Sequence, residues 1–128
     1  MKKPNVPRDR RKSPRLTIDL PLEYRLSSGL RPHGGIAVNA SEVGLLIRSI
    51  RDIPVGTKLN IAILFPKGFE LANFKLLAEI IWKDVYWEEN WQGYRYGAKI
   101  LKIQDEDRLK LKQLLSGRFQ LEEIYFSP

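Results

Sequence analysis

The sequence has no cysteine and only one histidine, and these two shortages exclude most metal and thiol chemistry. Without cysteine there is neither a disulfide framework nor a thiolate nucleophile, and a lone histidine cannot supply the clustered ligands of the usual metal sites. No apolar run approaches the roughly 18 residues that a membrane-spanning helix needs. Lys2 and Lys3 are not followed by an apolar segment, so they do not begin a signal peptide. We therefore expect a cytoplasmic protein that holds no metal and is not inserted in a membrane.

Groups arranged for catalysis are also missing. His33 falls in the turn "RPHGG", where we expect it to face solvent. The carboxylates at 88–89 and 105–107 are explained by a turn and by a helix start, and no base lies near Ser41 or Ser49 in the sequence. No glycine-rich loop of the P-loop or dinucleotide type is present. The sequence therefore predicts a protein that is not an enzyme and has no cofactor.

Positive charge is plentiful but gathers at one end of the chain. The 128 residues carry a net charge of +7, of which residues 1–15 contribute +6. This segment holds Lys2, Lys3, Arg8, Arg10, Arg11, Lys12 and Arg15 against Asp9 alone. Residues 1–14 also contain three prolines and little that could join a core, so we expect a flexible basic arm. Such an arm suits a partner that bears phosphate, although a solvated tail without a partner is the alternative.

Six short apolar segments follow the arm, joined by short polar connections. They read "LTIDLPLEYRL", "GGIAVNAS", "GLLIRSI", "KLNIAILFP", "FKLLAEIIWKDVYW" and "WQGYRYGAKILKI". The first and fourth alternate apolar and polar residues, which is typical of half-buried strands. The side chains expected to face inward are Leu16, Ile18, Leu20, Leu22, Tyr24, Leu59, Ile61, Ile63 and Phe65. Pro21 lacks a backbone donor and predicts an edge position or a bulge.

The last part of the pattern changes to helical spacing. The segment "QDEDRLKLKQLLSG" predicts a short helix with Asp105 as its N-cap and Gly117 at its end. The fold class is thus all-β: a six-stranded antiparallel barrel, or else a sandwich, with a basic N-terminal arm and a C-terminal helix. We divide the chain into an arm (1–14), a barrel with its helix (15–117) and a C-terminal tail (118–128).

Two polar motifs stand out from this framework. "RRKSPR" places Arg11 and Arg15 four residues apart, and the planar guanidinium group binds phosphate and the guanine edge in bidentate fashion. "NASEVG" offers the amide of Asn39, the hydroxyl of Ser41, and Gly44, which can adopt a positive φ and lets a ligand approach the backbone. The alternative for the second motif is a turn that bonds only its own backbone.

The two motifs, in this order around a first strand, resemble those of the PilZ domain family. RxxxR is matched by Arg11-Lys-Ser-Pro-Arg15, and (D/N)xSxxG by Asn39-Ala-Ser-Glu-Val-Gly44. "PVGTKLNIAILFP", "AEIIW" and "YGAKIL" resemble later strands of the family, so that the likeness covers roughly residues 8–116. The departure is Asn39, which stands where aspartate is commoner in the family and keeps an acceptor without the charge.

The resemblance implies a non-catalytic bacterial receptor for the second messenger cyclic di-GMP. By this likeness Arg11 and Arg15 bind guanine edges and phosphates, and Asn39, Ser41 and Gly44 line the other side of the ligand. Arg10 resembles a residue of family members that bind a stacked ligand dimer. The ligand would order the arm over the barrel and change a surface that a separate, unidentified effector protein reads.

Two further residues are candidates on less specific grounds. Trp82 can stack on a base and Lys99 can reach a phosphate, although most aromatic residues around them are expected to cover the barrel. A nucleic-acid-binding barrel is the first alternative function, but it is disfavoured because the charge lies in the arm and not across a barrel face. The second alternative is a PilZ-like adaptor that binds only proteins. A monomer and a homodimer are both compatible with the sequence.

Overall fold

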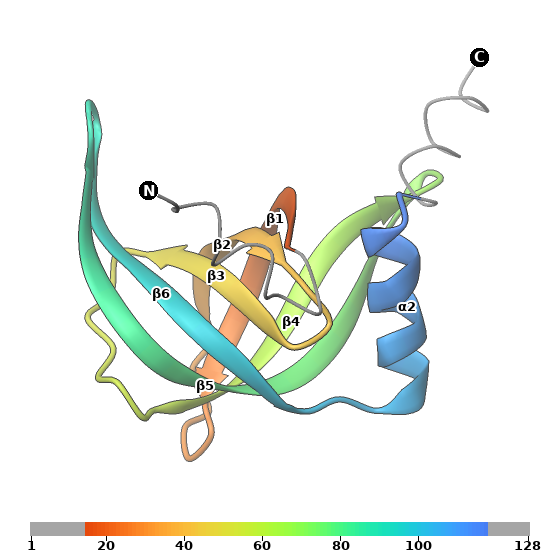
Figure 1. The fold of residues 1–128 in the computed structure, drawn as a ribbon, viewed down its shortest axis with the longest axis horizontal. Coiled ribbons are helices and arrows are strands. Elements are labelled where there is room, and N and C mark those ends of the chain that lie inside the picture. The colour runs from red at the N-terminus through yellow and green to blue at the C-terminus, as the bar shows by residue number, and fades with distance from the viewer. Residues whose placement is uncertain (1–14, 118–128) are drawn as a thin grey trace, which may run out of the picture.

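The computed structural model describes residues 15–117, which form six strands and one helix (Figure 1). The elements are β1 (Leu16–Leu26), β2 (His33–Ala40), β3 (Gly44–Ser49), β4 (Lys58–Lys67), β5 (Glu70–Glu88), β6 (Trp91–Lys102) and α2 (Asp105–Leu115). The predicted arm and tail, and with them Arg10 and Arg11, lie outside the described residues.

The strands close into an antiparallel, barrel-like ring in the order β1-β2-β3-β6-β5-β4. Closure depends on β1, which pairs with β2 along Leu16–Tyr24 and with β4 along Leu22–Leu26. The ring confirms the predicted six-stranded antiparallel barrel over the alternative sandwich. It also removes most strand edges, because every strand has a neighbour on each side along at least part of its length.

The core lies inside the ring and follows the alternation of the strands. On β4 the prediction is confirmed, since Leu59, Ile61, Ile63 and Phe65 are at most 2% exposed. On β1 it is only partly right: Ile18, Leu22 and Tyr24 are buried, but Leu16 is 39% exposed. Leu16 pairs with the buried Ala40 and so points inward, but it is the first residue of the strand and lies at the end of the ring. Between Thr17 and Leu20 the register against β2 shifts, and Asp19 there has φ 48°. This is the bulge that Pro21 predicted.

Helix α2 packs against β5 and buries Leu111 and Leu114 in the core. Two details differ from the prediction. The N-cap is Gln104, not Asp105, and its side chain makes no capping hydrogen bond. Leu109 is 57% exposed because it lies two residues from Leu111 and therefore cannot share its helical face. The predicted end is confirmed, since Gly117 follows the helix with φ 80°.

Side chains of the helix also bond the edge of β5 that β6 leaves unpaired after Lys102. The pairing of β6 with β5 stops at Lys102, opposite Leu77, so the earlier part of β5 loses that neighbour. There the backbone N–H of Lys75 donates to the carboxylate of Asp107 at 3.0 Å. Lys110 donates to the carbonyl oxygen of Asn73 at 3.2 Å. Side chains of α2 thus satisfy backbone groups of β5 that would otherwise face only water.

Candidate functional site

The turn "NASEVG" joins β2 to β3 and is organised around the hydroxyl of Ser41. Its oxygen accepts hydrogen bonds from the backbone N–H groups of Val43 (3.2 Å) and Gly44 (3.1 Å). The N–H of Ser41 donates in turn to the carbonyl of Gly44 at 2.9 Å. Ser41 is 2% exposed, so both its backbone and its side chain are held inside the turn. This is the self-bonded turn that the sequence left as an alternative, and it fixes the shape of the motif.

Gly44 serves close packing and not an unusual backbone conformation. Its φ is not positive, so that expectation was wrong. A Cβ at this position would lie 2.9 Å from the carbonyl oxygen of Ala98 on β6. The neighbouring carbonyl of Val43 accepts from the N–H of Ile100 at 2.9 Å, which draws the turn onto the same strand. Only glycine lets β3 begin so close to β6.

Asn39 holds a buried acceptor without a partner. Its Oδ1 accepts no hydrogen bond within the part of the chain that the structure describes. Buried polar atoms are nearly always bonded, so an exception of this kind requires an explanation. Asn39 pairs with Thr17 on β1 and with Leu46 on β3, two residues whose side chains are not buried. Its side chain therefore belongs to the outward face of the ring, where a ligand could supply the missing donor.

Arg15 lies beside this turn because of the register of β1. Leu16, the residue that follows it, pairs with Ala40, the residue before Ser41. The C-terminal arginine of RxxxR and the NxSxxG turn therefore meet at one corner of the ring.

Trp82 and Lys99 share the outward face with the motif. The strand pairs Asn39–Leu46, Leu46–Gly97 and Gly97–Trp82 form one row across β2, β3, β6 and β5. Residues opposite one another in a sheet point to the same face, so this row joins Asn39 to Trp82. Lys99 pairs with Gly44 and is exposed on the same face. Both low-ranking candidates from the sequence are thus placed on the motif's side of the ring.

Gly97 makes room for the ring of Trp82, a relation that the sequence analysis missed. A Cβ at Gly97 would lie 2.0 Å from Nε1 of Trp82, so the indole rests directly on the glycine backbone. The indole is 38% exposed in this position. The row thus contains a partly exposed aromatic surface of the kind on which a base stacks. The glycine between Tyr96 and Ala98 was the available signal, since an interior strand glycine often marks a close approach.

A stacked cluster of arginine and aromatic side chains extends the same face toward the β5–β6 turn. The guanidinium of Arg48 lies 4.4 Å from the ring centre of Trp91 and 4.8 Å from that of Tyr86. Arg95 lies 4.9 Å from the Tyr86 ring on the same hairpin. The sequence predicted only that most aromatic residues of this hairpin belong to the core or cover the barrel. Of Tyr86, Trp87, Trp91, Tyr94 and Tyr96, only Tyr96 is fully buried.

His33 is not the turn residue that we expected. It is the first residue of β2, and its ring centre lies 5.4 Å from that of Tyr24. Its pKa is lowered by desolvation and by the charges of Arg51 and Arg31. This position gives the histidine a structural contact. Among residues 15–117, no three histidine or carboxylate side chains gather in a way that could hold a metal ion.

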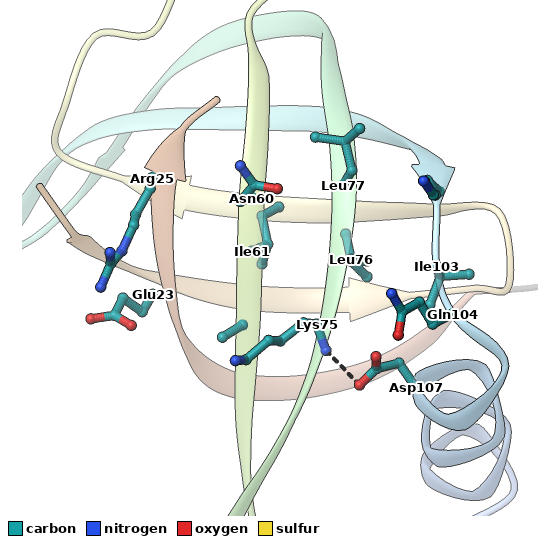
Figure 2. A pocket seen from close by; sticks show the side chains of 12 residues that line it. Glu23, Arg25, Asn60, Ile61, Lys75, Leu76, Leu77, Ile103, Gln104 and Asp107 are labelled. Atoms are coloured by element: carbon teal, nitrogen blue, oxygen red, sulfur yellow. Dashed lines mark hydrogen bonds between the residues drawn. The ribbon is translucent and has the colours of Figure 1, made fainter. Parts of the chain in front are cut away.

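A hollow of the described surface lies elsewhere, over β1, β4 and β5 near the start of α2 (Figure 2). It has a volume of about 740 Å³ and contains none of the predicted site residues. Its polar lining includes Glu23, Arg25, Asn60, Lys75, Gln104 and Asp107. Figure 2 shows Asp107 pointing to Lys75, whose backbone N–H it binds. The described residues of the two motifs, Arg15, Asn39, Ser41 and Gly44, lie outside this hollow.

The family model that matches the chain is that of the PilZ domain, over residues 9–117. The chain belongs to the PilZ domain family. No protein with a curated description matches it. In the described residues of this PilZ domain, no helix is long and apolar enough to cross a membrane.

Three solved structures share the fold of this PilZ domain. The PilZ domain of Escherichia coli YcgR, solved with c-di-GMP, is 12% identical with a TM-score of 0.67, covering 93% of this chain and 99% of that one. The Bacillus subtilis inhibitor of motility MotI/DgrA is 16% identical with a TM-score of 0.67, covering 89% and 52%. Klebsiella MrkH in its apo state is 14% identical with a TM-score of 0.64, covering 88% and 53%. The chain thus spans about half the length of MotI/DgrA and MrkH.

Proposed function

We propose that this protein is a non-catalytic, cytoplasmic receptor for cyclic di-GMP. The observation that carries the proposal is the pairing of Leu16 with Ala40, which brings the end of RxxxR beside the NxSxxG turn. Neither motif is specific alone, but a ligand that needs both requires them to meet. Membership in the PilZ family supports this ligand, as does the fold shared with a PilZ domain solved in complex with c-di-GMP.

The chemistry of the corner suits a guanine dinucleotide. The buried Oδ1 of Asn39 can accept a hydrogen bond from a guanine N–H group, which would satisfy an atom that has no donor among residues 15–117. Arg11 and Arg15 supply planar cations for the phosphates and the guanine edge. In this proposal Ser41 and Gly44 act mainly by fixing the turn, because their hydrogen bonds and packing are internal. Trp82 and Lys99 extend the surface for a base and a phosphate.

The signal would come from the arm. Without ligand the like charges of residues 1–15 repel one another, and a ligand with two phosphates neutralises part of that charge. Ordering the arm costs about 1–2 kcal/mol for each residue that becomes fixed. Charge-assisted bonds to the ligand must exceed this cost. The closed arm then presents a changed surface next to the β2–β3 turn, which a separate effector protein can bind.

Isothermal titration of the chain with cyclic di-GMP tests the proposal. The decisive variant is Arg11→Ala/Arg15→Ala, and its matched control is Lys2→Ala/Lys3→Ala, which removes the same charge from the same arm. Each charge-assisted hydrogen bond contributes about 1.5–3 kcal/mol, so the motif variant should bind about 100-fold more weakly or not at all. The control should bind nearly as well as the wild type.

The same titration separates the alternatives. An equal loss in both double variants would show that only charge matters, and would reject the motif. If cyclic di-GMP gives no heat while a single-stranded RNA binds with a steep salt dependence, the protein is a nucleic-acid-binding barrel. If neither binds, the adaptor without a nucleotide takes precedence. A stoichiometry near two would support a stacked ligand dimer and a role for Arg10.

A further inference from the structure

Part of β5 extends past its neighbour β4 and presents an unpaired strand edge. The ladder between β4 and β5 ends at Lys58–Glu79, and the loop that precedes β4 makes its last backbone bonds to β5 at Ile80, through Gly56 and Thr57. β5 continues to Glu88, paired with β6 on its other side. On the β4 side, the segment Trp82–Glu88 therefore has no strand partner among the described residues. In Figure 1 the tip of this hairpin projects beyond the rest of the ring.

The charged side chains of this edge do not prevent it from pairing with another strand. Charged side chains on an edge strand commonly prevent it from pairing with a strand of another molecule. The segment Trp82–Glu88 contains three charged residues, Lys83, Asp84 and Glu88. All three are neutralised within the chain. Asp84 pairs with Arg95 at 2.7 Å, Glu88 pairs with Arg48 at 3.3 Å, and Lys83 pairs with Asp52. The two arginines lie on β6 and β3, on the opposite side of β5 from the free edge.

The hairpin is also stiffened and apolar where it projects. Arg48 lies between the rings of Tyr86 and Trp91 and so ties both strands of the hairpin to β3. On the other face, Val85 is 53% exposed and Trp87 is 66% exposed. A stiff edge loses little conformational entropy on pairing, and the exposed apolar side chains would be covered by it.

We propose that the occupant of this edge is a second copy of the same chain, paired antiparallel through Trp82–Glu88 about a two-fold axis at Val85. Val85 is the middle residue of the segment, so this register uses the whole free edge and makes the two halves equivalent. It sets Lys83 opposite Trp87 of the second copy, a cation–π pair, and Asp84 opposite Tyr86. No like charges stand directly opposite one another, so the segment is complementary to itself.

Sedimentation velocity of the full chain over a concentration series tests the dimer. The wild type should shift from monomer to dimer with increasing concentration. Val85→Lys places two ammonium groups face to face at the axis and should abolish the shift, while circular dichroism shows that the partly exposed site still folds. Leu71→Lys is the matched control, because Leu71 is 67% exposed at the other end of β5. This variant should dimerise as the wild type does.

Single cysteines test the register, since the natural chain contains none. Opposite residues in an antiparallel pair have Cα atoms about 4.5–5.5 Å apart, which is within the range for a disulfide. Val85→Cys should therefore form a covalent dimer on mild oxidation, and Leu71→Cys should not. A wild type that stays monomeric overturns the proposal and leaves the edge to a different extended peptide. A dimer that survives Val85→Lys overturns it as well, because its interface would lie elsewhere.

Discussion

At the scale of single residues, the glycines of this domain differ in the atoms that an added Cβ would meet. Gly44 and Gly97 both adopt backbone conformations open to any residue, yet each has a neighbour inside the space of a Cβ. At Gly44 that neighbour is the backbone carbonyl of Ala98, and at Gly97 it is the side chain of Trp82. A side chain can swing aside, whereas a strand in a closed ring cannot. Replacement by alanine should therefore destabilise the fold at Gly44, whereas at Gly97 it should mainly move the indole of Trp82 on the outward surface.

We predict that Gly44→Ala destabilises the domain by about 1–3 kcal/mol, because the new methyl group forces β3 away from β6. Gly34→Ala is the control, since Gly34 lies on the neighbouring strand β2 and a Cβ there meets nothing within 4 Å. Urea denaturation of the two variants measures the difference. Equal stabilities would show that the contact with Ala98 relaxes freely, and that Gly44 is not required for packing.

The sequence motifs led us to expect that Arg15 and the NxSxxG turn meet, and the pairing of Leu16 with Ala40 brings them together. The contacts that each side chain of the turn makes could not be predicted. Two short motifs and a strand between them were enough to place Asn39, Ser41 and Gly44 in one turn. The hydroxyl of Ser41 accepts hydrogen bonds from its own turn, whereas Oδ1 of Asn39 has no partner in the described part of the chain. This difference depends on the directions in which the two side chains point. The positive φ predicted for Gly44 was wrong because local propensity ignores the distance to β6, a strand more than 50 residues away.

At the scale of elements, the alternation of apolar residues predicted the strands well where the pleat is regular. β4 is regular and its inward residues are all buried, whereas β1 contains a bulge and its first residue, Leu16, is 39% exposed at the end of the ring. The helix was also found, but its first residue was misplaced by one. Aspartate is a residue type that often caps helices, but the residue in the N-cap position here is Gln104, and Asp105 is the first residue of the helix. The acidic first turn serves instead to stabilise the helix and, through Asp107, to reach β5.

The contact between α2 and β5 gives a second prediction. Asp107→Ala removes the acceptor for the N–H of Lys75, and should lower the free energy of unfolding by about 0.5–1.5 kcal/mol more than Asp105→Ala does. Both changes remove one carboxylate from the same helical turn, so the effect on the helix dipole is shared. Urea denaturation gives the difference. Hydrogen exchange at Lys75 provides the local reading, since its amide should lose protection only in Asp107→Ala. Equal exchange in both variants contradicts the edge-covering role of α2.

At the scale of the whole molecule, the net charge is concentrated at one end of the chain. Residues 1–15 carry nearly all of the net charge, while the ring supplies a nearly neutral, rigid surface with the NxSxxG turn at one corner. The free edge of β5 lies on a different strand from that corner. The proposed dimer edge shares only Trp82 with the proposed ligand surface, and Val85 points to the other face of β5 from Trp82. A variant at Val85 should therefore leave cyclic di-GMP binding unchanged.

The proposed signal can be tested because it requires two separate segments of the chain, the basic arm and the NxSxxG turn, to respond to the ligand together. If the arm closes over the ligand, cyclic di-GMP should slow hydrogen exchange in two separate segments together, residues 8–15 and residues 39–46. Arg11→Ala/Arg15→Ala should remove protection from both, because neither half of the site holds the ligand alone. Protection confined to residues 39–46 would mean that the ligand binds the ring without ordering the arm, and that the signal must arise from the barrel surface itself. Hydrogen-exchange mass spectrometry with and without ligand distinguishes these outcomes, since the two segments fall in different peptides.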